Sequence, residues 1–310
     1  MVTAIGLGLA AVGRPAYINL GRVAELPASR SVTALRAVTH ALLDQAYAAG
    51  IRHIDVARSY GRAEEFLGAW LAERGHQDLV ISSKWGYAYV GDWRLDAPVH
   101  EAKEHSADRF LAQWRESRSL LGDAISLYQV HSLTSDSPLF TDRRLLEELA
   151  ALAGSGVRLG FSTSGPRQPE TIRRAFELEV SGVRLFTAVQ STWNLLEPSA
   201  GAALAEARAA GAWVLVKETL ANGRLAVDPP GPVAELATAR GDTPDAVALA
   251  AALSQPWADV VLTGPASGAQ LAGNLAAEAI TLADAERDRL AALAEVPEEY
   301  WARRAALAWQ

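Results

Sequence analysis

Four side chains suited to proton transfer follow three consecutive apolar stretches of the sequence. Asp55 lies near the end of one stretch and Tyr60 just beyond it, Lys84 comes near the end of the next, and His131 ends the third. Reduction of a carbonyl group calls for such a set, because hydride addition to carbon builds negative charge on oxygen and a positioned acid must then deliver a proton. The combination therefore indicates carbonyl reduction.

Each of the four residue types has its own reason to be present. Tyr60 is the candidate acid, with an ordinary pKa of about 10. A lysine ammonium beside it favours the phenolate, so Lys84 is expected to lower that pKa, and Asp55 is expected to hold the ammonium in place. The His131 imidazole is suited to hydrogen-bond the substrate oxygen and to fix its position.

Apolar runs alternate with amphipathic, helix-like segments eight times along the 310 residues. Continuous apolar runs are typical of parallel strands that are buried on both faces, and eight strand-helix units predict a closed (β/α)8 TIM barrel of the α/β class. We expect residues 1–310 to form a single domain, with a long loop from Gly86 to His105 after strand three and an extra C-terminal helix from Leu282 to Val296. The expected strands are 4–11, 51–57, 79–85, 125–131, 157–163, 186–192, 212–218 and 259–264; the helices between them include 169–182 and 268–278.

The carboxyl ends of parallel barrel strands meet on one rim, which brings the four side chains together. The run DVARSYGRAEEFLG at 55–68 resembles the signature of the aldo-keto reductase family, and the segments ISSKWGY and LYQVHS resemble its two later catalytic positions. The resemblance covers residues 6–278 and is to the branch of potassium-channel beta subunits and bacterial aldo-keto reductases. It implies an NAD(P)H-dependent reductase of aldehydes or ketones, or a dehydrogenase of the corresponding alcohols or sugars, with Tyr60 as proton donor.

The same resemblance implies a cofactor site on the later strands. Polar residues ending strands five and six would hold the nicotinamide carboxamide, the segment after strand seven would cover the pyrophosphate, and the start of the last barrel helix would bind phosphate and adenine. Lys217 stands where family members often place an aromatic residue. NADP(H) is the expected cofactor, with NAD(H) as the alternative, since Lys or Arg does not occur in 264–274. The predicted cofactor-binding residues are Ser162, Thr163, Gln190, Lys217, Leu220, Asn222, Gly223, Ser267, Gln270 and Asn274.

Aromatic residues near the same rim suggest a pocket for a ring-shaped or apolar carbonyl compound, or for a sugar that stacks on aromatic faces. The predicted substrate-binding residues are Trp85, Tyr87, Trp93 and Trp193.

Composition excludes several other classes of function. The chain has 29 basic and 36 acidic residues, a net charge of -7 and no basic patch, which argues against nucleic-acid and anionic-membrane partners. It has no cysteine, and its six histidines show no metal-ligand spacing. No stretch reaches the roughly 20 apolar residues of a membrane span, and Met1 to Ala11 lacks the basic start of a secretory signal. We expect a cytoplasmic monomer or small homo-oligomer that acts on a small molecule and uses no metal.

Two other functions remain open from the sequence. Lys84 or Lys217 is placed to form a Schiff base with a carbonyl substrate, as a lyase or aldolase does. A cofactor-binding regulatory subunit, like the potassium-channel beta subunits, would share both barrel and site.

Overall fold

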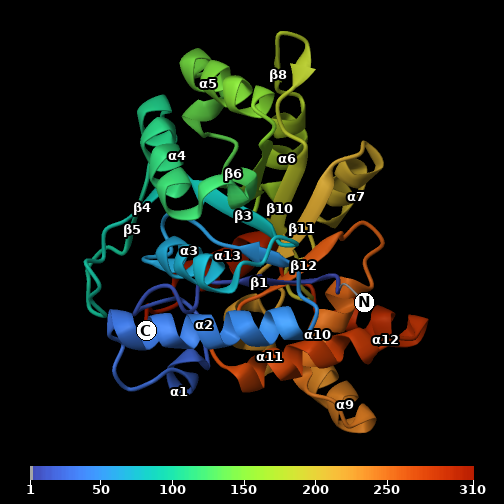
Figure 1. Cartoon of the computed structure of the whole chain (residues 1–310). Coiled ribbons are helices and arrows are strands. Elements are labelled where there is room, and N and C mark those ends of the chain that lie inside the picture. The colour runs from blue at the N-terminus through green and yellow to red at the C-terminus, as the bar shows by residue number, and fades with distance from the viewer. Residues whose placement is uncertain (1–2) are drawn as a thin grey trace.

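Eight parallel strands close into a barrel in the computed structural model, which describes residues 3–310 (Figure 1). Neighbours pair in the order β1-β2-β3-β6-β7-β10-β11-β12, and β12 returns to β1. The predicted (β/α)8 barrel is confirmed. Its strands are β1 (Ile5–Gly8), β2 (His53–Asp55), β3 (Val80–Trp85), β6 (Ile125–Leu133), β7 (Arg158–Thr163), β10 (Ala188–Thr192), β11 (Trp213–Lys217) and β12 (Val260–Thr263).

Helices surround the barrel, and their buried faces cover the outer side of the strands (Figure 1). Local signals fix their ends: Ser106 caps α4, Asp142 caps α5 and Ser267 caps α11 by accepting a hydrogen bond from a backbone N–H in the first turn. The helices are α1 (Arg22–Glu25), α2 (Val32–Ala48), α3 (Ala63–Arg74), α4 (Ala107–Leu121), α5 (Arg143–Gly154), α6 (Gln168–Phe176), α7 (Gly201–Ala209), α8 (Arg224–Val227), α9 (Gly231–Arg240), α10 (Pro244–Leu253), α11 (Gly268–Leu275), α12 (Asp284–Ala291) and α13 (Pro297–Ala305).

The barrel interior has an apolar layer and a polar layer. A buried cluster separate from the main core takes side chains from β6, β10, β11 and β12: Leu127, Ala188, Leu215, Val260 and Leu262. Buried polar side chains of the same barrel surround the Asp55 carboxylate, among them Ser82, Gln129 and Gln190. The apolar layer supports the polar one, and the polar layer carries the candidate site.

Three segments differ from the sequence prediction. The helix expected at 169–182 ends at Phe176, because Ser181 and Gly182 adopt positive φ angles of 53° and 77° and turn the chain into a short hairpin of β8 (Glu179–Val180) and β9 (Val183–Arg184). The helix expected from Leu282 to Val296 is α12 alone, and Pro297 begins a second helix, α13. Helices α8 and α9 after β11 were not predicted.

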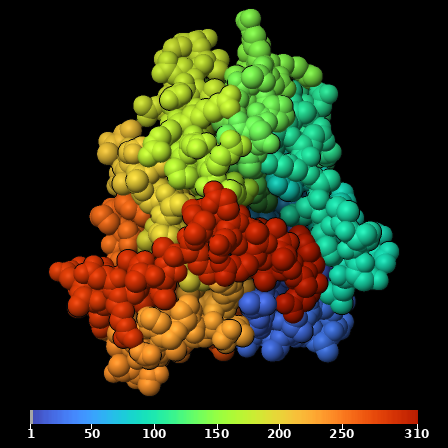
Figure 2. All heavy atoms as spheres, turned by 180° about the vertical axis from the view of Figure 1, so that it is seen from behind, coloured from blue at the N-terminus to red at the C-terminus, as the bar shows by residue number. Residues whose placement is uncertain are grey.

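The connection from Gly86 to His105 forms an antiparallel ribbon of β4 (Tyr87–Tyr89) and β5 (Glu101–Lys103) at its base. Seen from behind, α13 and the chain end, in red, cross the middle of the molecule between the segments drawn in green and those drawn in orange and blue (Figure 2). No helix within residues 3–310 is both long and apolar enough to cross a membrane.

Candidate active site

The four predicted catalytic residues meet at the carboxyl ends of β2, β3 and β6. Lys84 is fully buried and its ammonium forms an ion pair with the Asp55 carboxylate. The same nitrogen donates to the Val56 carbonyl at 3.0 Å and lies 3.4 Å from the Tyr60 hydroxyl. The lysine thus joins the carboxylate of one strand to the phenol of the loop that follows it.

Neighbouring strands hold the Asp55 carboxylate on its other side. Oδ1 accepts hydrogen bonds from the Ser82 hydroxyl at 2.6 Å and from the Gln190 amide at 2.9 Å, with Gln129 Nε2 at 3.4 Å. A buried carboxylate with one ammonium and several neutral donors has its hydrogen-bonding capacity filled, so it is held fixed in place.

The Tyr60 phenol lies between aromatic and cationic groups. Its ring meets the His131 ring edge to face, with centroids 5.5 Å apart, and the Arg14 guanidinium carbon lies 5.1 Å from its ring centroid. Burial raises the pKa of Tyr60 well above 10, the Asp55 carboxylate adds to this rise, and Arg14 opposes it. The net shift is opposite to the one expected from the sequence, so the phenol keeps its proton at neutral pH.

His131 is a neutral hydrogen-bonding group. Burial, reinforced by the Lys84 and Lys217 ammonium groups, lowers its pKa well below 6.5. Its Nδ1 lies 3.3 Å from the Ser59 hydroxyl, and the Tyr87 ring centroid lies 5.0 Å from its own. A neutral imidazole next to the phenol is suited to position a polar oxygen without taking the proton itself.

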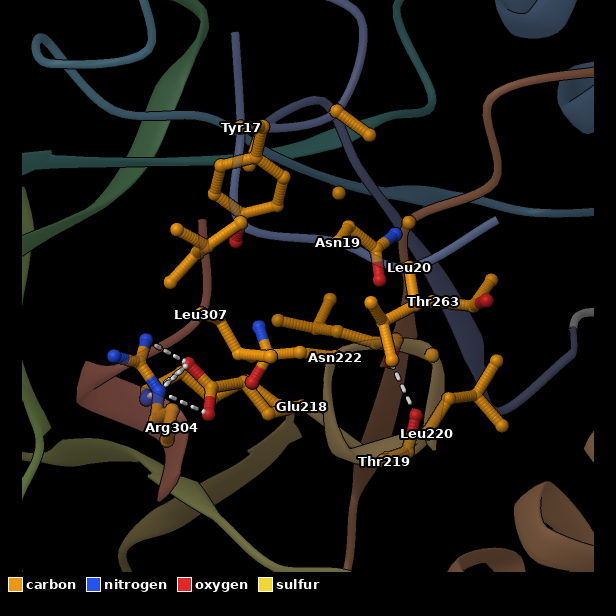
Figure 3. A pocket seen from close by; sticks show the side chains of 18 of the residues that line it. Tyr17, Asn19, Leu20, Glu218, Thr219, Leu220, Asn222, Thr263, Arg304 and Leu307 are labelled. Carbon is orange, nitrogen blue, oxygen red and sulfur yellow. Dashed lines mark hydrogen bonds and ion pairs between the residues drawn. The ribbon is translucent and has the colours of Figure 1, made fainter. Parts of the chain in front are cut away.

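A cavity of about 1720 Å³, counted with its part open to solvent, extends from these residues along the rim. Tyr17 and Asn19 face Leu307 and Asn222 across it, with Arg304 on the left of the view and Thr263 on the right (Figure 3). Asp55, Tyr60, His131, Gln190 and Lys217 line the catalytic end, whereas Asp245, Thr263, Gly264, Gln270 and Asn274 line the far end.

Seven of the ten predicted cofactor residues line this cavity: Gln190, Lys217, Leu220, Asn222, Gly223, Gln270 and Asn274. The other three do not. The Ser162 hydroxyl accepts from the Ser132 N–H, Thr163 bonds to Gln168 and Ser191 inside the fold, and Ser267 caps α11 beside Glu25.

Of the predicted substrate residues, Tyr87 lines the cavity and the three tryptophans do not. Trp85 is fully buried against Phe110 of α4, with ring centroids 5.0 Å apart. Trp93 donates to the Arg30 carbonyl at 2.8 Å, and Trp193 packs edge to face on Trp257 at 5.9 Å. These three rings pack within the fold and not against the candidate substrate space.

Replacing Trp85 with alanine is therefore expected to act on stability. Removal of a buried tryptophan should lower the free energy of unfolding by about 3 kcal/mol, while KM for a carbonyl substrate stays within about twofold. Urea unfolding and steady-state kinetics on the same preparation check this. A raised KM with an unchanged free energy of unfolding would show that Trp85 contributes to substrate binding.

Sequence reasoning missed the charged residues that cover the cavity. Arg14 is 1% exposed, pairs with Glu101 at 2.7 Å and has its guanidinium over the rings of Tyr17 and Trp309. Its position before Pro15 in a loop carries no signal of this role. The Glu101 partner lies 87 residues further along the chain.

A second ion pair joins α13 to the segment after β11. Arg304 donates to the Glu218 carboxylate, with a shortest N–O distance of 2.5 Å (Figure 3). Burial by itself would raise the pKa of Glu218, but Arg304 and Lys217 lower it to about 2. Beyond α13, Leu307 and Trp309 also line the cavity, so the C-terminal segment 304–309 forms part of its cover.

The chain end is fastened to the loop after β1. Gln310 exchanges two backbone hydrogen bonds with Tyr17, at 3.0 and 3.2 Å. The buried Arg22 donates to the Gln310 carbonyl at 2.7 Å and to the carbonyls of Ala11, Arg14 and Pro15. One guanidinium thereby holds both segments that cover the catalytic end.

Lys217 lies under this cover at the end of β11. Its ammonium donates to the Thr192 hydroxyl at 2.8 Å and lies 3.7 Å from Glu218. Burial lowers the pKa of Lys217 to about 8, although Glu218 opposes the shift. Lys217 thus lines the cavity with an amine that is partly neutral near neutral pH.

The sequence profile of the aldo/keto reductase family matches residues 4–295, almost the entire chain. The chain belongs to the aldo-keto reductase family. Membership makes it an NAD(P)H-dependent oxidoreductase, and it confirms the resemblance seen around Asp55, Lys84 and His131.

Among solved structures, the barrel is similar to that of PA4992, a presumed aldo-keto reductase from Pseudomonas aeruginosa. The two sequences are 24% identical, the match covers 90% of this chain and 91% of the other, and the TM-score is 0.65. This likeness shows the fold of this aldo-keto reductase. No curated protein matches the chain.

The cavity suits the dinucleotide that this family uses. Asn222 is 7% exposed and lines the cavity, and its side-chain oxygen has no hydrogen-bond partner within residues 3–310. Gly8 and Gly264 also line it, and a methyl group at either glycine would meet nothing closer than 3.4 Å, so their lack of a side chain leaves open room. An unpaired buried acceptor beside open space indicates a polar ligand.

Proposed function

We propose that this protein reduces the carbonyl group of a small aldehyde or ketone, or oxidises the corresponding alcohol or sugar, with Tyr60 as the proton donor. The contact that carries the proposal is the 3.4 Å approach of Lys84 Nζ to the Tyr60 hydroxyl, at a phenol that also lines the cavity. A bound nicotinamide dinucleotide would supply or accept the hydride.

The residues of this chain supply the proton and the position of the substrate. Tyr60 holds its proton at neutral pH and faces the cavity next to the neutral His131 ring. The substrate oxygen would accept from both, and the Lys84 ammonium would stabilise the phenolate that remains after proton transfer. Asp55 keeps that ammonium in place.

Gln190, Lys217, Leu220, Asn222, Gly223, Gln270 and Asn274 would hold the dinucleotide. The cover of the catalytic end suits a ring-shaped carbonyl compound, since Tyr87 lines the cavity with an aromatic ring and the Arg14–Glu101 pair lies in the same lining. The test is loss of nicotinamide absorbance with a panel of aldehydes, ketones and sugars. No turnover of any carbonyl by a protein that binds the dinucleotide would point to a regulatory subunit instead.

Schiff-base chemistry is a second candidate, favoured by Lys217 alone. This lysine lines the cavity with a pKa of about 8, whereas Lys84 is engaged by Asp55. The neutral amine is the nucleophile, and its fraction grows as pH rises through the pKa.

Borohydride trapping of a carbonyl compound on Lys217 is expected to rise about tenfold between about pH 7 and about pH 9. Mass spectrometry of the reduced adduct measures it, with Lys217→Met as the blank. Adduct formation that needs no nicotinamide and accompanies carbon–carbon cleavage would favour the lyase over the reductase. Absence of any adduct on Lys217 at the higher pH removes this candidate.

A further inference from the structure

The two ends of the cavity differ in how their charged side chains are paired. At the catalytic end Arg14 pairs with Glu101, Arg304 pairs with Glu218, and Lys217 lies 3.7 Å from Glu218. The basic side chains that line it within residues 3–310 are Arg14, Lys217 and Arg304, and all three lie at the catalytic end. The far end has two carboxylates instead. Asp245 lines the cavity there, and Glu25 accepts a hydrogen bond from the Ser267 hydroxyl at 2.5 Å.

Both carboxylates lack a cationic partner. Neither Glu25 nor Asp245 forms an ion pair with a basic side chain anywhere in the described part of the chain, residues 3–310. The Asn274 amide, oriented so that its oxygen accepts from the Thr263 hydroxyl, donates to Asp245 Oδ2 at 2.9 Å. Arg22 shares helix α1 with Glu25 but is fully engaged with four backbone carbonyls. Asp245 therefore presents an unbalanced negative charge to whatever enters this end, and Glu25 places a second one beside the first turn of α11.

The start of α11 does not offset them. A helix amino terminus contributes about half a positive charge. One backbone N–H of this turn is already taken, because the Ser267 hydroxyl accepts from the Gln270 N–H at 3.2 Å, and the Gln270 side chain accepts from the Ala266 N–H just before the helix at 2.8 Å. The two full negative charges of Asp245 and Glu25 therefore outweigh the partial positive charge of the helix start.

We propose that this protein prefers NAD(H) to NADP(H), with Asp245 and Glu25 as the residues that discriminate between them. The proposal rests on the proposed function, since a nicotinamide at Tyr60 leads the rest of the dinucleotide along the cavity to this end. A carboxylate accepts a hydrogen bond from an unmodified ribose hydroxyl and repels a 2′-phosphate, which elsewhere is held by arginine. The preference is opposite to the NADP(H) expected from the sequence.

Direct binding tests the preference without turnover. NADH and NADPH are titrated by protein fluorescence, and AMP and adenosine 2′,5′-bisphosphate are titrated by calorimetry as a matched pair that probes the far end alone. We expect Kd to be about tenfold lower for NADH than for NADPH, and lower for AMP than for the bisphosphate, with both differences shrinking as salt is added. Equal or tighter binding of NADPH overturns the preference.

The variant Glu25→Gln/Asp245→Asn removes both charges and keeps the side-chain shapes. It is expected to lower Kd for NADPH by about fivefold and to leave Kd for NADH within about twofold. Glu147→Gln, on an exposed face of α5, is the control. It removes one negative charge far from the cavity and should change neither the Kd for NADH nor the Kd for NADPH. An unchanged NADPH affinity in the double variant removes the assigned role of these carboxylates.

Failure of the folded native protein to bind either dinucleotide overturns the proposed function itself. Tighter binding of NADPH than of NADH by the native protein overturns the preference alone.

Discussion

Tyr60→Phe should lower kcat for carbonyl reduction by about a thousandfold or more, because it removes the proton donor and keeps the ring. The edge-to-face contact with His131 needs only the ring, so the local packing is retained. Dinucleotide affinity is expected to stay within about twofold, since the phenol hydroxyl is directed at the substrate in this proposal. Single-turnover kinetics and fluorescence titration measure the two effects separately.

Tyr47→Phe provides the matched control. Tyr47 lies on α2, where its hydroxyl donates to the Asp78 carboxylate at 2.9 Å, far from the cavity lining. This variant should keep full activity. Retention of more than about a tenth of the activity in Tyr60→Phe would assign the proton to another group, with His131 the next to examine.

Lys84→Met is expected to lower the free energy of unfolding by about 3–5 kcal/mol and to abolish reduction. The substitution leaves the Asp55 carboxylate, 3% exposed, without the ammonium that balances its charge. Hydrogen bonds from Ser82 and Gln190 remain but do not neutralise it. Urea unfolding followed by circular dichroism measures the loss.

A charge-matched variant separates burial from the loss of a positive charge. Arg143 pairs with Glu147 on the surface of α5 with its side chain 91% exposed, so Arg143→Met should cost about 0.5 kcal/mol or less. The double variant Asp55→Asn/Lys84→Met should recover much of the lost stability without recovering activity. Equal urea midpoints for Lys84→Met and the native protein would show that the pair contributes little.

The sequence was sufficient to predict the barrel and the convergence of four side chains, because both depend on local pattern. Apolar runs mark buried parallel strands, and the closed order of strands puts Asp55, Lys84 and His131 on one rim. The types of these residues then restrict the candidate chemistry to proton transfer. Their proximity follows from chain topology, since neighbouring parallel strands bring their carboxyl ends close to one another.

The position of Trp85 outside the cavity lining has a simple geometric origin. Side chains alternate between the two faces of a strand, so the residue after an inward-facing Lys84 must face outward. Trp85 accordingly packs on Phe110 of the helix layer. Proximity in sequence to a catalytic residue is therefore a poor guide to the substrate site on a strand, and alternation is the better one.

The residues that cover the site could not be predicted from the sequence, for a different reason. Arg14 pairs with Glu101 and Glu218 with Arg304, contacts that join residues 87 and 86 positions apart. No local period or turn signal encodes such a pairing. The pKa of Tyr60 was likewise mispredicted, because the degree of burial is a property of the folded rim and outweighs the nearby cations.

The hydrogen bonds of Gln310 with Tyr17 and Arg22 have a consequence for the order in which parts of the site are synthesised. A nascent chain that has been synthesised through β12 already contains every strand of the barrel and all four candidate catalytic side chains. It does not yet contain Arg304, Leu307 and Trp309, which line the cavity of the folded protein. Glu218 therefore has no Arg304 to pair with at this stage. The residues that form the barrel are thus synthesised before those that complete the cover of the cavity.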